Sequence, residues 1–241
     1  MIATQQLLPN RTILASTFNI TTSVSNGACF IVNENNTQFL ITAKHLFPKK
    51  SRNGEVIEFS IAGTQVAKKI KLPVFFHDNA QVDIAIFKLT EKIVTDEVLP
   101  MKDEANFYLA QECLFLGYPL FNIGTQTDIG KVPFVKKAIV SAFLEINKVR
   151  TMLLDGQNNP GFSGGPIITY SESMDKQFII GMVSGYLRQS EDFTLKTGEI
   201  KSTYQVNENS GIIISYTSKY IKEVILKLSF SAGSLTEDPA V

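Results

Sequence analysis

The sequence predicts an all-β fold of antiparallel strands, with one α-helix near its C-terminal end. Short apolar runs rich in β-branched and aromatic residues are separated by turn residues along most of the chain. Helical spacing of apolar residues is clear only at residues 217–228. Short strands spaced by turns are typical of antiparallel barrels or of a β-sandwich.

The first half of the chain contains six predicted strands. Residues 28–32 and 37–43 predict a hairpin, because two apolar runs flank the turn sequence Asn-Glu-Asn-Asn at 33–36. One strand is predicted before this hairpin and three after it, at residues 11–22, 56–61, 66–76 and 84–89.

The second half contains seven predicted strands. They lie at residues 112–118, 132–146, 150–154, 166–170, 178–187, 202–206 and 212–215. The charged, polar stretch 189–202 predicts a solvated loop or an excursion between two of them.

The helix at 217–228 is predicted from a single apolar stripe. Its members are Ile221, Val224, Ile225 and Leu228. Thr217 or Ser218 can act as the N-cap. Residues 230–241 are small and polar, and they predict a flexible tail.

The composition is that of a globular protein with a large core, since 44% of the 241 residues are hydrophobic and 19% are charged. With 23 basic and 23 acidic residues, the chain gives no indication of a nucleic-acid or membrane partner. No apolar run approaches the roughly 18 residues that span a bilayer, and no signal-like start is present. Cys29 and Cys113 lie in apolar runs and predict buried free thiols, so a cytoplasmic location is expected.

The strongest functional signal is Asn-Asn-Pro-Gly-Phe-Ser-Gly-Gly-Pro at residues 158–166. Glycine permits backbone angles that other residues avoid and proline fixes φ, so this stretch predicts a shaped turn around Ser163. Such a turn can present the serine hydroxyl outward and point backbone N–H groups at a developing oxyanion. A plain Gly/Pro-rich turn is the alternative, and the partners of the serine decide between the two.

A serine nucleophile needs a base, and the chain has two histidines. His45 stands at the end of an apolar strand, whereas His77 lies where a strand signal gives way to polar residues. Histidine has a pKa of about 6.5 and exchanges protons near neutrality. Asp83 abuts an apolar strand, where an unpaired carboxylate is costly to bury. Pairing with an imidazole explains this placement better than a surface turn does.

The G-x-S-x-G spelling also marks the nucleophile elbow of α/β-hydrolases, in which the histidine follows the serine and strands alternate with helices. Both histidines here precede Ser163, and the body of the chain has no alternating helices. Residue order and strand pattern therefore exclude that fold.

The order histidine, aspartate, serine is that of the chymotrypsin-like serine proteases, and three motifs make the resemblance specific. T-A-K-H at 42–45 resembles the family's T-A-x-H, and V-D-I-A at 82–85 resembles its D-[IL]-A. G-F-S-G-G-P at 161–166 resembles G-x-S-G-G-P. Weaker matches are G-Y-P at 117–119 and I-G-M-V-S-G at 180–185.

Within that family, Asn-Pro-Gly before the serine and N-S-G-I-I-I at 209–214 are similar to the bacterial branch, which includes Deg-type high-temperature-requirement proteases. The resemblance implies two antiparallel six-stranded β-barrels and a C-terminal helix. Residues 1–101 would form the first barrel, and residues 102–229 the second barrel with the helix. Animal digestive members carry an aspartate where this chain has Phe162, so their zymogen switch cannot operate here.

The resemblance also implies roles for the site residues. Ser163 would attack a peptide carbonyl, His45 would take and return the proton, and Asp83 would hold the imidazole. The N–H groups of Gly161 and Ser163 would bind the oxyanion. The expected partner is a protein or peptide substrate, and no metal or cofactor is expected.

The substrate pocket is implied by position within the same family pattern. Its expected residues are Gln157, Ser184, Gly185 and Tyr186. Because no carboxylate or histidine falls among them, cleavage after Arg, Lys or Glu is not expected. An apolar or small uncharged residue before the cut is predicted.

The sequence thus predicts a trypsin-like serine endopeptidase. One alternative is a latent binding module that needs a regulatory protein partner to open its site, because Lys44 and Phe162 adjoin the predicted base and nucleophile. Another is a transferase or esterase that uses the same three residues on a different acyl group.

Overall fold

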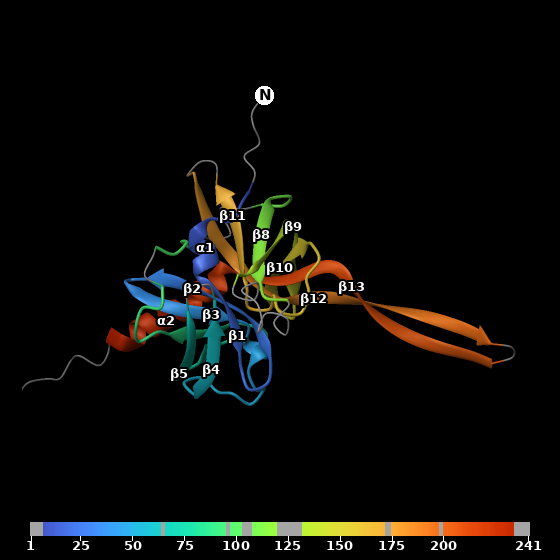
Figure 1. The fold of residues 1–241 in the computed structure, drawn as a ribbon, viewed down its shortest axis with the longest axis horizontal. Helices are drawn as coiled ribbons and strands as arrows, with labels where there is room; N and C mark the ends of the chain where they lie inside the picture. Colours follow the sequence, from blue (N-terminus) through green and yellow to red (C-terminus); the bar gives the residue numbers. More distant parts are fainter. Residues whose placement is uncertain are drawn as a thin grey trace, which may run out of the picture.

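The computed structural model describes residues 7–63, 66–94, 97–102, 108–119, 132–171, 175–197 and 200–233. Over these ranges the chain forms two antiparallel sheets and a C-terminal helix, which confirms the predicted all-β fold class (Figure 1). None of the helices in the described ranges is long and apolar enough to cross a membrane.

The first sheet has seven strands in the order β5-β4-β1-β2-β3-β7-β6. They are β1 (Thr17–Thr21), β2 (Asn26–Glu34), β3 (Thr37–Thr42), β4 (Val56–Ala62), β5 (Ala67–Pro73), β6 (Phe75–Phe76) and β7 (Ala85–Lys88). A six-stranded barrel was expected here, whereas over the described residues the sheet has seven strands and does not close, with β5 and β6 at its ends. The difference arises where the predicted strand at 66–76 divides. Pro73 has no N–H to continue a ladder, so Phe75 and Phe76 pair with β7 instead.

The second sheet is a closed six-stranded barrel in the order β10-β13-β12-β11-β8-β9, as the family resemblance implies. Its strands are β8 (Glu112–Gly117), β9 (Phe134–Ile146), β10 (Val149–Asp155), β11 (Pro166–Ser171), β12 (Lys176–Thr197) and β13 (Ile200–Thr217). Its interior holds a separate apolar cluster that includes Phe115 and Phe162. Cys29 and Cys113 are free and buried, as predicted, and burial raises the pKa of the Cys113 thiol to about 12.

The prediction of one strand over residues 11–22 is wrong in its first part. Residues Arg11–Ala15 form a short helix, α1, and β1 begins only at Thr17. Asn10 is the N-cap, because its side-chain oxygen accepts a hydrogen bond from the backbone N–H of Ile13 at 3.0 Å. This local bond, together with the burial of Ile13, favours a helical turn over an extended start.

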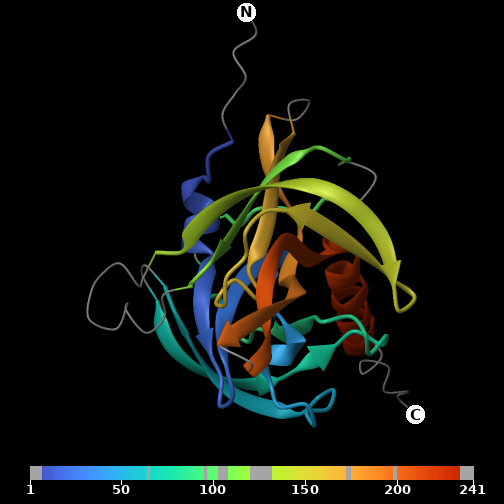
Figure 2. The same ribbon diagram turned by 90° about the vertical axis from the view of Figure 1, so that its right-hand side faces the viewer.

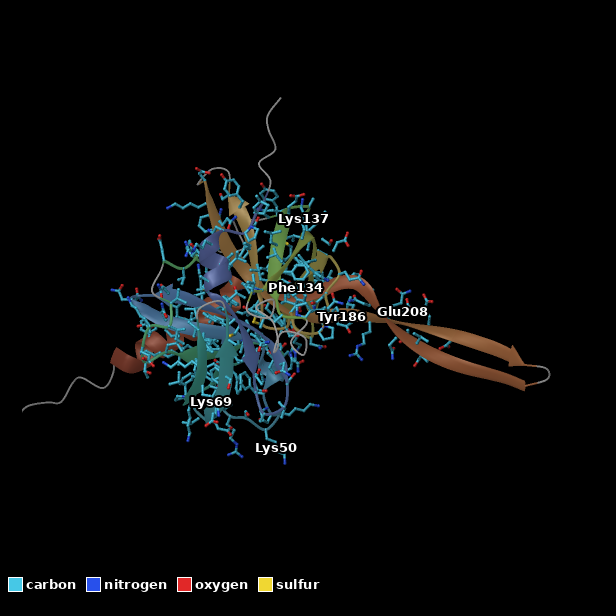
Figure 3. All side chains as sticks on the ribbon, in the orientation of Figure 1. Lys50, Lys69, Phe134, Lys137, Tyr186 and Glu208 are labelled. Carbon is cyan, nitrogen blue, oxygen red and sulfur yellow. The ribbon has the colours of Figure 1, made fainter. Side chains whose placement is uncertain are left out.

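The prediction of a loop at 189–202 is also wrong. Strands β12 and β13 pair from Arg188↔Asn209 to Thr197↔Ile200, and this long hairpin projects from the second barrel (Figure 1). Tyr186 and Glu208 mark its root (Figure 3). The described side chains of residues 188–192 and 205–208 are exposed. Exposed strands carry little apolar alternation, and the outer part of β12 was accordingly not predicted as a strand. The strand predicted at residues 202–206 lies in the outer part of β13.

The predicted C-terminal helix is confirmed and is longer than expected. Helix α2 spans Ser218–Gly233, and residues 234–241 of the predicted tail at 230–241 lie outside the described ranges. Its buried residues Ile221, Val224 and Ile225 belong to the larger apolar cluster, which holds the core of the first sheet and also includes Leu116, Ile168 and Met182 of the second. Figure 2 shows this red helix beside strands of the first half of the chain. Helix α2 therefore packs against both sheets, through β7 of the first and β12 of the second.

The N-terminal segment makes the reciprocal contact. The backbone N–H of Asn10 donates to the side-chain oxygen of Gln177 on β12 at 3.2 Å. The amide of the same glutamine donates to the carbonyl oxygen of Leu8. The N-terminal segment thus binds a strand of the second sheet, as α2 contacts a strand of the first.

The two sheets meet at the residues after the serine turn. The N–H of Ala28 on β2 donates to the carbonyl oxygen of Ser163 at 2.8 Å. Gly164 packs so closely that an added Cβ would lie 2.2 Å from the carbonyl oxygen of Ala28. This contact places the serine turn directly against the first sheet.

Candidate active site

His45 stands just after β3, in a short 3₁₀ turn over Lys44–Leu46. Its backbone N–H donates to Oδ1 of Asp83 at 2.8 Å, and its ring Nδ1 lies 2.7 Å from Oδ2 of the same carboxylate. A carboxylate only accepts hydrogen bonds, so Nδ1 carries the proton and Nε2 of the neutral ring is left as a base. The side chain of His45 is 48% exposed, whereas that of Asp83 is 16% exposed.

The pKa of His45 reflects two opposing effects. Burial of part of the ring disfavours its charged form, but the hydrogen bond and the negative charge of Asp83 together outweigh that effect. The pKa of His45 is therefore raised above its ordinary value of 6.5.

Ser184 connects the carboxylate to the predicted nucleophile. Its hydroxyl donates to Oδ2 of Asp83 at 2.5 Å. Its carbonyl oxygen accepts a hydrogen bond from Oγ of Ser163 at 2.9 Å. The structure thus brings His45, Asp83 and Ser163 to one place between the two sheets. The sequence predicted Ser184 as a pocket residue, and its contact with Asp83 was not foreseen.

The turn before Ser163 has the geometry of a type II β-turn. The N–H of Phe162 donates to the carbonyl oxygen of Asn159 at 3.3 Å, with Pro160 second and Gly161 third in the turn. Gly161 has φ of +103°, the positive value that the third position of a type II turn requires. An added Cβ there would lie 2.3 Å from the carbonyl oxygen of Tyr118, so only glycine fits. We call residues 159–162 the oxyanion turn.

The backbone N–H groups on either side of that of Phe162, those of Gly161 and Ser163, are available to donate a hydrogen bond. In the part of the chain that the structure describes, the N–H groups of Gly161 and Ser163 make no hydrogen bond. Two neighbouring donors beside a serine hydroxyl suit the stabilisation of a developing oxyanion. These are the two amides that the sequence predicts as oxyanion donors.

The predicted pocket residues lie around a residue that the sequence analysis did not single out. Ser184, Gly185 and Tyr186 are half-buried on β12, whereas Gln157 is exposed. Beside them Asn158 is 1% exposed, and its side-chain amide donates to the carbonyl oxygen of Gly185 at 3.1 Å. Its Oδ1 is buried without a partner among the described residues. Only its place in the 158–166 stretch could have indicated it.

The second histidine, His77, makes its hydrogen bonds outside this site. Its Nδ1 accepts a hydrogen bond from the backbone N–H of Asn79 at 3.0 Å, and its Nε2 lies 2.7 Å from the carboxylate of Glu223 on α2. An imidazole that accepts at Nδ1 carries its proton on Nε2 and donates it to the glutamate. His77 therefore helps to anchor α2 on the first sheet.

Comparison with known proteins gives a family and a fold. A family described as trypsin-like peptidase domain matches residues 27–174. A search of curated proteins finds no match.

Among solved structures, the HtrA-type protease AlgW with a tripeptide is similar, with a TM-score of 0.60 and 17% identity over 90% of this chain. A serine-to-alanine variant of AlgW gives the same values. The chain spans 61% of the length of these AlgW chains. An inactive serine-to-alanine mutant of Rv3671c from M. tuberculosis H37Rv has a TM-score of 0.53 and 14% identity, over 96% of this chain and 98% of that one. At these identities the likeness concerns the fold alone.

Proposed function

The chain belongs to the trypsin-like peptidase family, and on that premise we propose that it is a serine endopeptidase that acts through Ser163, His45 and Asp83. The observation that carries the proposal is the Asp83 carboxylate. It binds both the backbone N–H and the ring of His45, and it is joined to Ser163 through Ser184. A carboxylate that orients an imidazole beside a serine hydroxyl is the arrangement that activates serine as a nucleophile.

In the proposed reaction, Oγ of Ser163 turns from the carbonyl of Ser184 toward Nε2 of His45 and attacks the substrate carbonyl. His45 takes the hydroxyl proton and then gives it to the leaving amine, which yields an acyl-enzyme. Water, deprotonated by the same imidazole, hydrolyses that ester. The N–H groups of Gly161 and Ser163 bind the oxyanion, and one such donor is worth roughly 3–4 kcal/mol in comparable sites.

The substrate is proposed to be a protein or peptide that lies along Ser184–Tyr186. The similar AlgW structures hold a tripeptide, which supports a peptide ligand for this chain. The predicted pocket residues Gln157, Ser184 and Tyr186 are uncharged, in keeping with an uncharged residue before the cut. Because the ammonium group of Lys44 donates to the carbonyl of Ala80, outside this pocket, it does not alter that preference.

Activity is expected to rise with pH through the pKa of His45. The base must be neutral to accept a proton, and Asp83 raises this pKa, so half-maximal kcat/KM is expected above pH 6.5. The linked stability has the opposite sign: the contribution of protonated His45 is complete below 6.5 and is lost as pH rises through the raised pKa. A kcat/KM profile from pH 5 to 9 measures the midpoint. A midpoint below 6.5 would contradict the pairing of His45 with Asp83.

A fluorophosphonate probe tests the nucleophile directly, because the serine oxygen displaces fluoride and retains the phosphonyl group. Wild type is expected to be labelled, whereas Ser163→Ala and His45→Ala should lose labelling. His77→Ala is the matched control and should keep it, since His77 binds Glu223 instead. Equal labelling of wild type and Ser163→Ala would refute the proposal.

A latent binding module is the second candidate, and one observation favours it. Oγ of Ser163 donates to the carbonyl of Ser184 rather than to His45. If that bond holds the serine in an inactive rotamer, a regulatory protein partner would have to release it. Folded wild type that resists the probe and still binds peptide would support this candidate. Probe labelling without hydrolysis of any peptide would instead support an esterase or transferase.

A further inference from the structure

We propose that Lys136 is a positioning residue that holds the oxyanion turn in its productive conformation. This inference rests on the proposed function, because the turn matters only if Gly161 and Ser163 bind an oxyanion. Lys136 lies on β9, outside the motifs that indicate the site.

The contacts of Lys136 converge on the start of the turn. Its Nζ donates to the carbonyl oxygen of Gln157 at 2.8 Å and to Oδ1 of Asn159. Asn159 is the first residue of the turn, and its carbonyl accepts the N–H of Phe162. One ammonium group therefore fixes both the strand exit and the first residue of the turn.

The same ammonium lies over the ring of Phe162, 5.3 Å from its centroid. This ring is fully buried and packs against Phe115 at 5.0 Å. Phe162 sits between the two proposed oxyanion donors in the chain. The cation–π contact thus links Lys136 to the residue that anchors the turn in the barrel. Partial desolvation, which lowers the pKa of Lys136, agrees with a group held against the protein surface.

An outside contact is needed to fix the turn type, because glycine does not restrict its own backbone conformation. Gly161 can adopt either sign of φ, and the peptide between Pro160 and Gly161 turns over between type I and type II. In one orientation the N–H of Gly161 faces the site, and in the other it points away. Gln157, Asn159 and Pro160 are exposed, and burial holds the segment only at Asn158 and Phe162, on either side of the Pro160–Gly161 peptide. After this peptide, the N–H of Tyr118 donates to the carbonyl oxygen of Gly161 at 2.9 Å. Before it, Asn158 bonds to Gly185 and Asn209, and Lys136 is the side chain that binds Asn159.

The test compares Lys136→Met with Lys137→Met. Lys137 is the next residue on β9 (Figure 3), is 56% exposed and pairs with Glu112 instead. Methionine keeps most of the side-chain length and removes the charge and the donors. On a peptide substrate, Lys136→Met is expected to lower kcat about 10- to 100-fold with KM changed less than about threefold, because an oxyanion interaction forms in the transition state. Lys136→Arg should recover part of kcat, and Lys137→Met should match wild type.

Hydrogen–deuterium exchange over residues 156–163 supplies a readout that does not depend on turnover. Faster exchange there in Lys136→Met but not in Lys137→Met, at equal melting temperature, is the expected result. Unchanged exchange together with unchanged kcat would overturn the proposal. If wild type hydrolyses no peptide, the exchange data alone decide whether Lys136 positions the turn, and only the proposed function falls.

Discussion

Replacing Asp83 with asparagine is expected to lower kcat by about 10⁴-fold while the protein stays folded. The asparagine side chain would keep an oxygen for the backbone N–H of His45, which Oδ1 of Asp83 accepts at 2.8 Å. Its amide group would replace Oδ2, which lies 2.7 Å from Nδ1. An amide donates to Nδ1 and so forces the proton onto Nε2, where the imidazole can no longer act as a base.

The measurement is kcat on a peptide substrate, with melting temperature as the check on folding. Asp78→Asn is the matched control, because Asp78 also precedes the apolar strand but pairs with Lys227 in solvent. It should leave kcat unchanged. A loss of less than tenfold in Asp83→Asn would show that Asp83 does not orient the base.

Gly164→Ala is expected to destabilise the protein by about 3 kcal/mol or more. The added Cβ would lie 2.2 Å from the carbonyl oxygen of Ala28 and 2.4 Å from Oγ1 of Thr42. Both atoms belong to the first sheet, so relief of the clash requires the two sheets to separate. The φ of +84° adds a conformational cost.

Gly54→Ala separates these two costs. Gly54 has a similar φ of +78°, and its Cβ would meet nothing within 4 Å. It should lose only about 1 kcal/mol. Urea denaturation measures both free energies of unfolding. A difference of less than about 0.5 kcal/mol between the variants would mean that the sheets are not held in close contact at Gly164.

Strands made of buried residues were the part of the fold that the sequence predicted well. Strands β2 and β3 appear in the sequence as apolar runs around a turn, because their side chains fill the core of the first sheet. Helix α2 was predicted for the same reason. The outer part of β12 was not predicted, because pairing with β13 defines it. The strand predicted at residues 202–206 lies in the outer part of β13, but its pairing with β12 was not foreseen.

The residues of the site also divide into those that the sequence predicted and those that it did not. His45, Asp83 and Ser163 could be predicted because short local motifs surround each of them. Lys136 and Asn158 could not, since their contacts join residues about 20 to 30 positions apart, and no local pattern records such a pairing.

The contacts that helix α2 makes with the first half of the chain can form only late in translation. A ribosome releases the first sheet long before it makes α2, whose Ile221, Val224 and Ile225 belong to the apolar cluster that this sheet shares with the second. The anchor of His77 on Glu223 likewise joins residues 146 positions apart. A nascent chain that has emerged only as far as Ser163 therefore lacks the bond from His77 to Glu223 and the packing of α2 on β7, the strand that follows Asp83. We expect the site to reach its final packing only after α2 has been made.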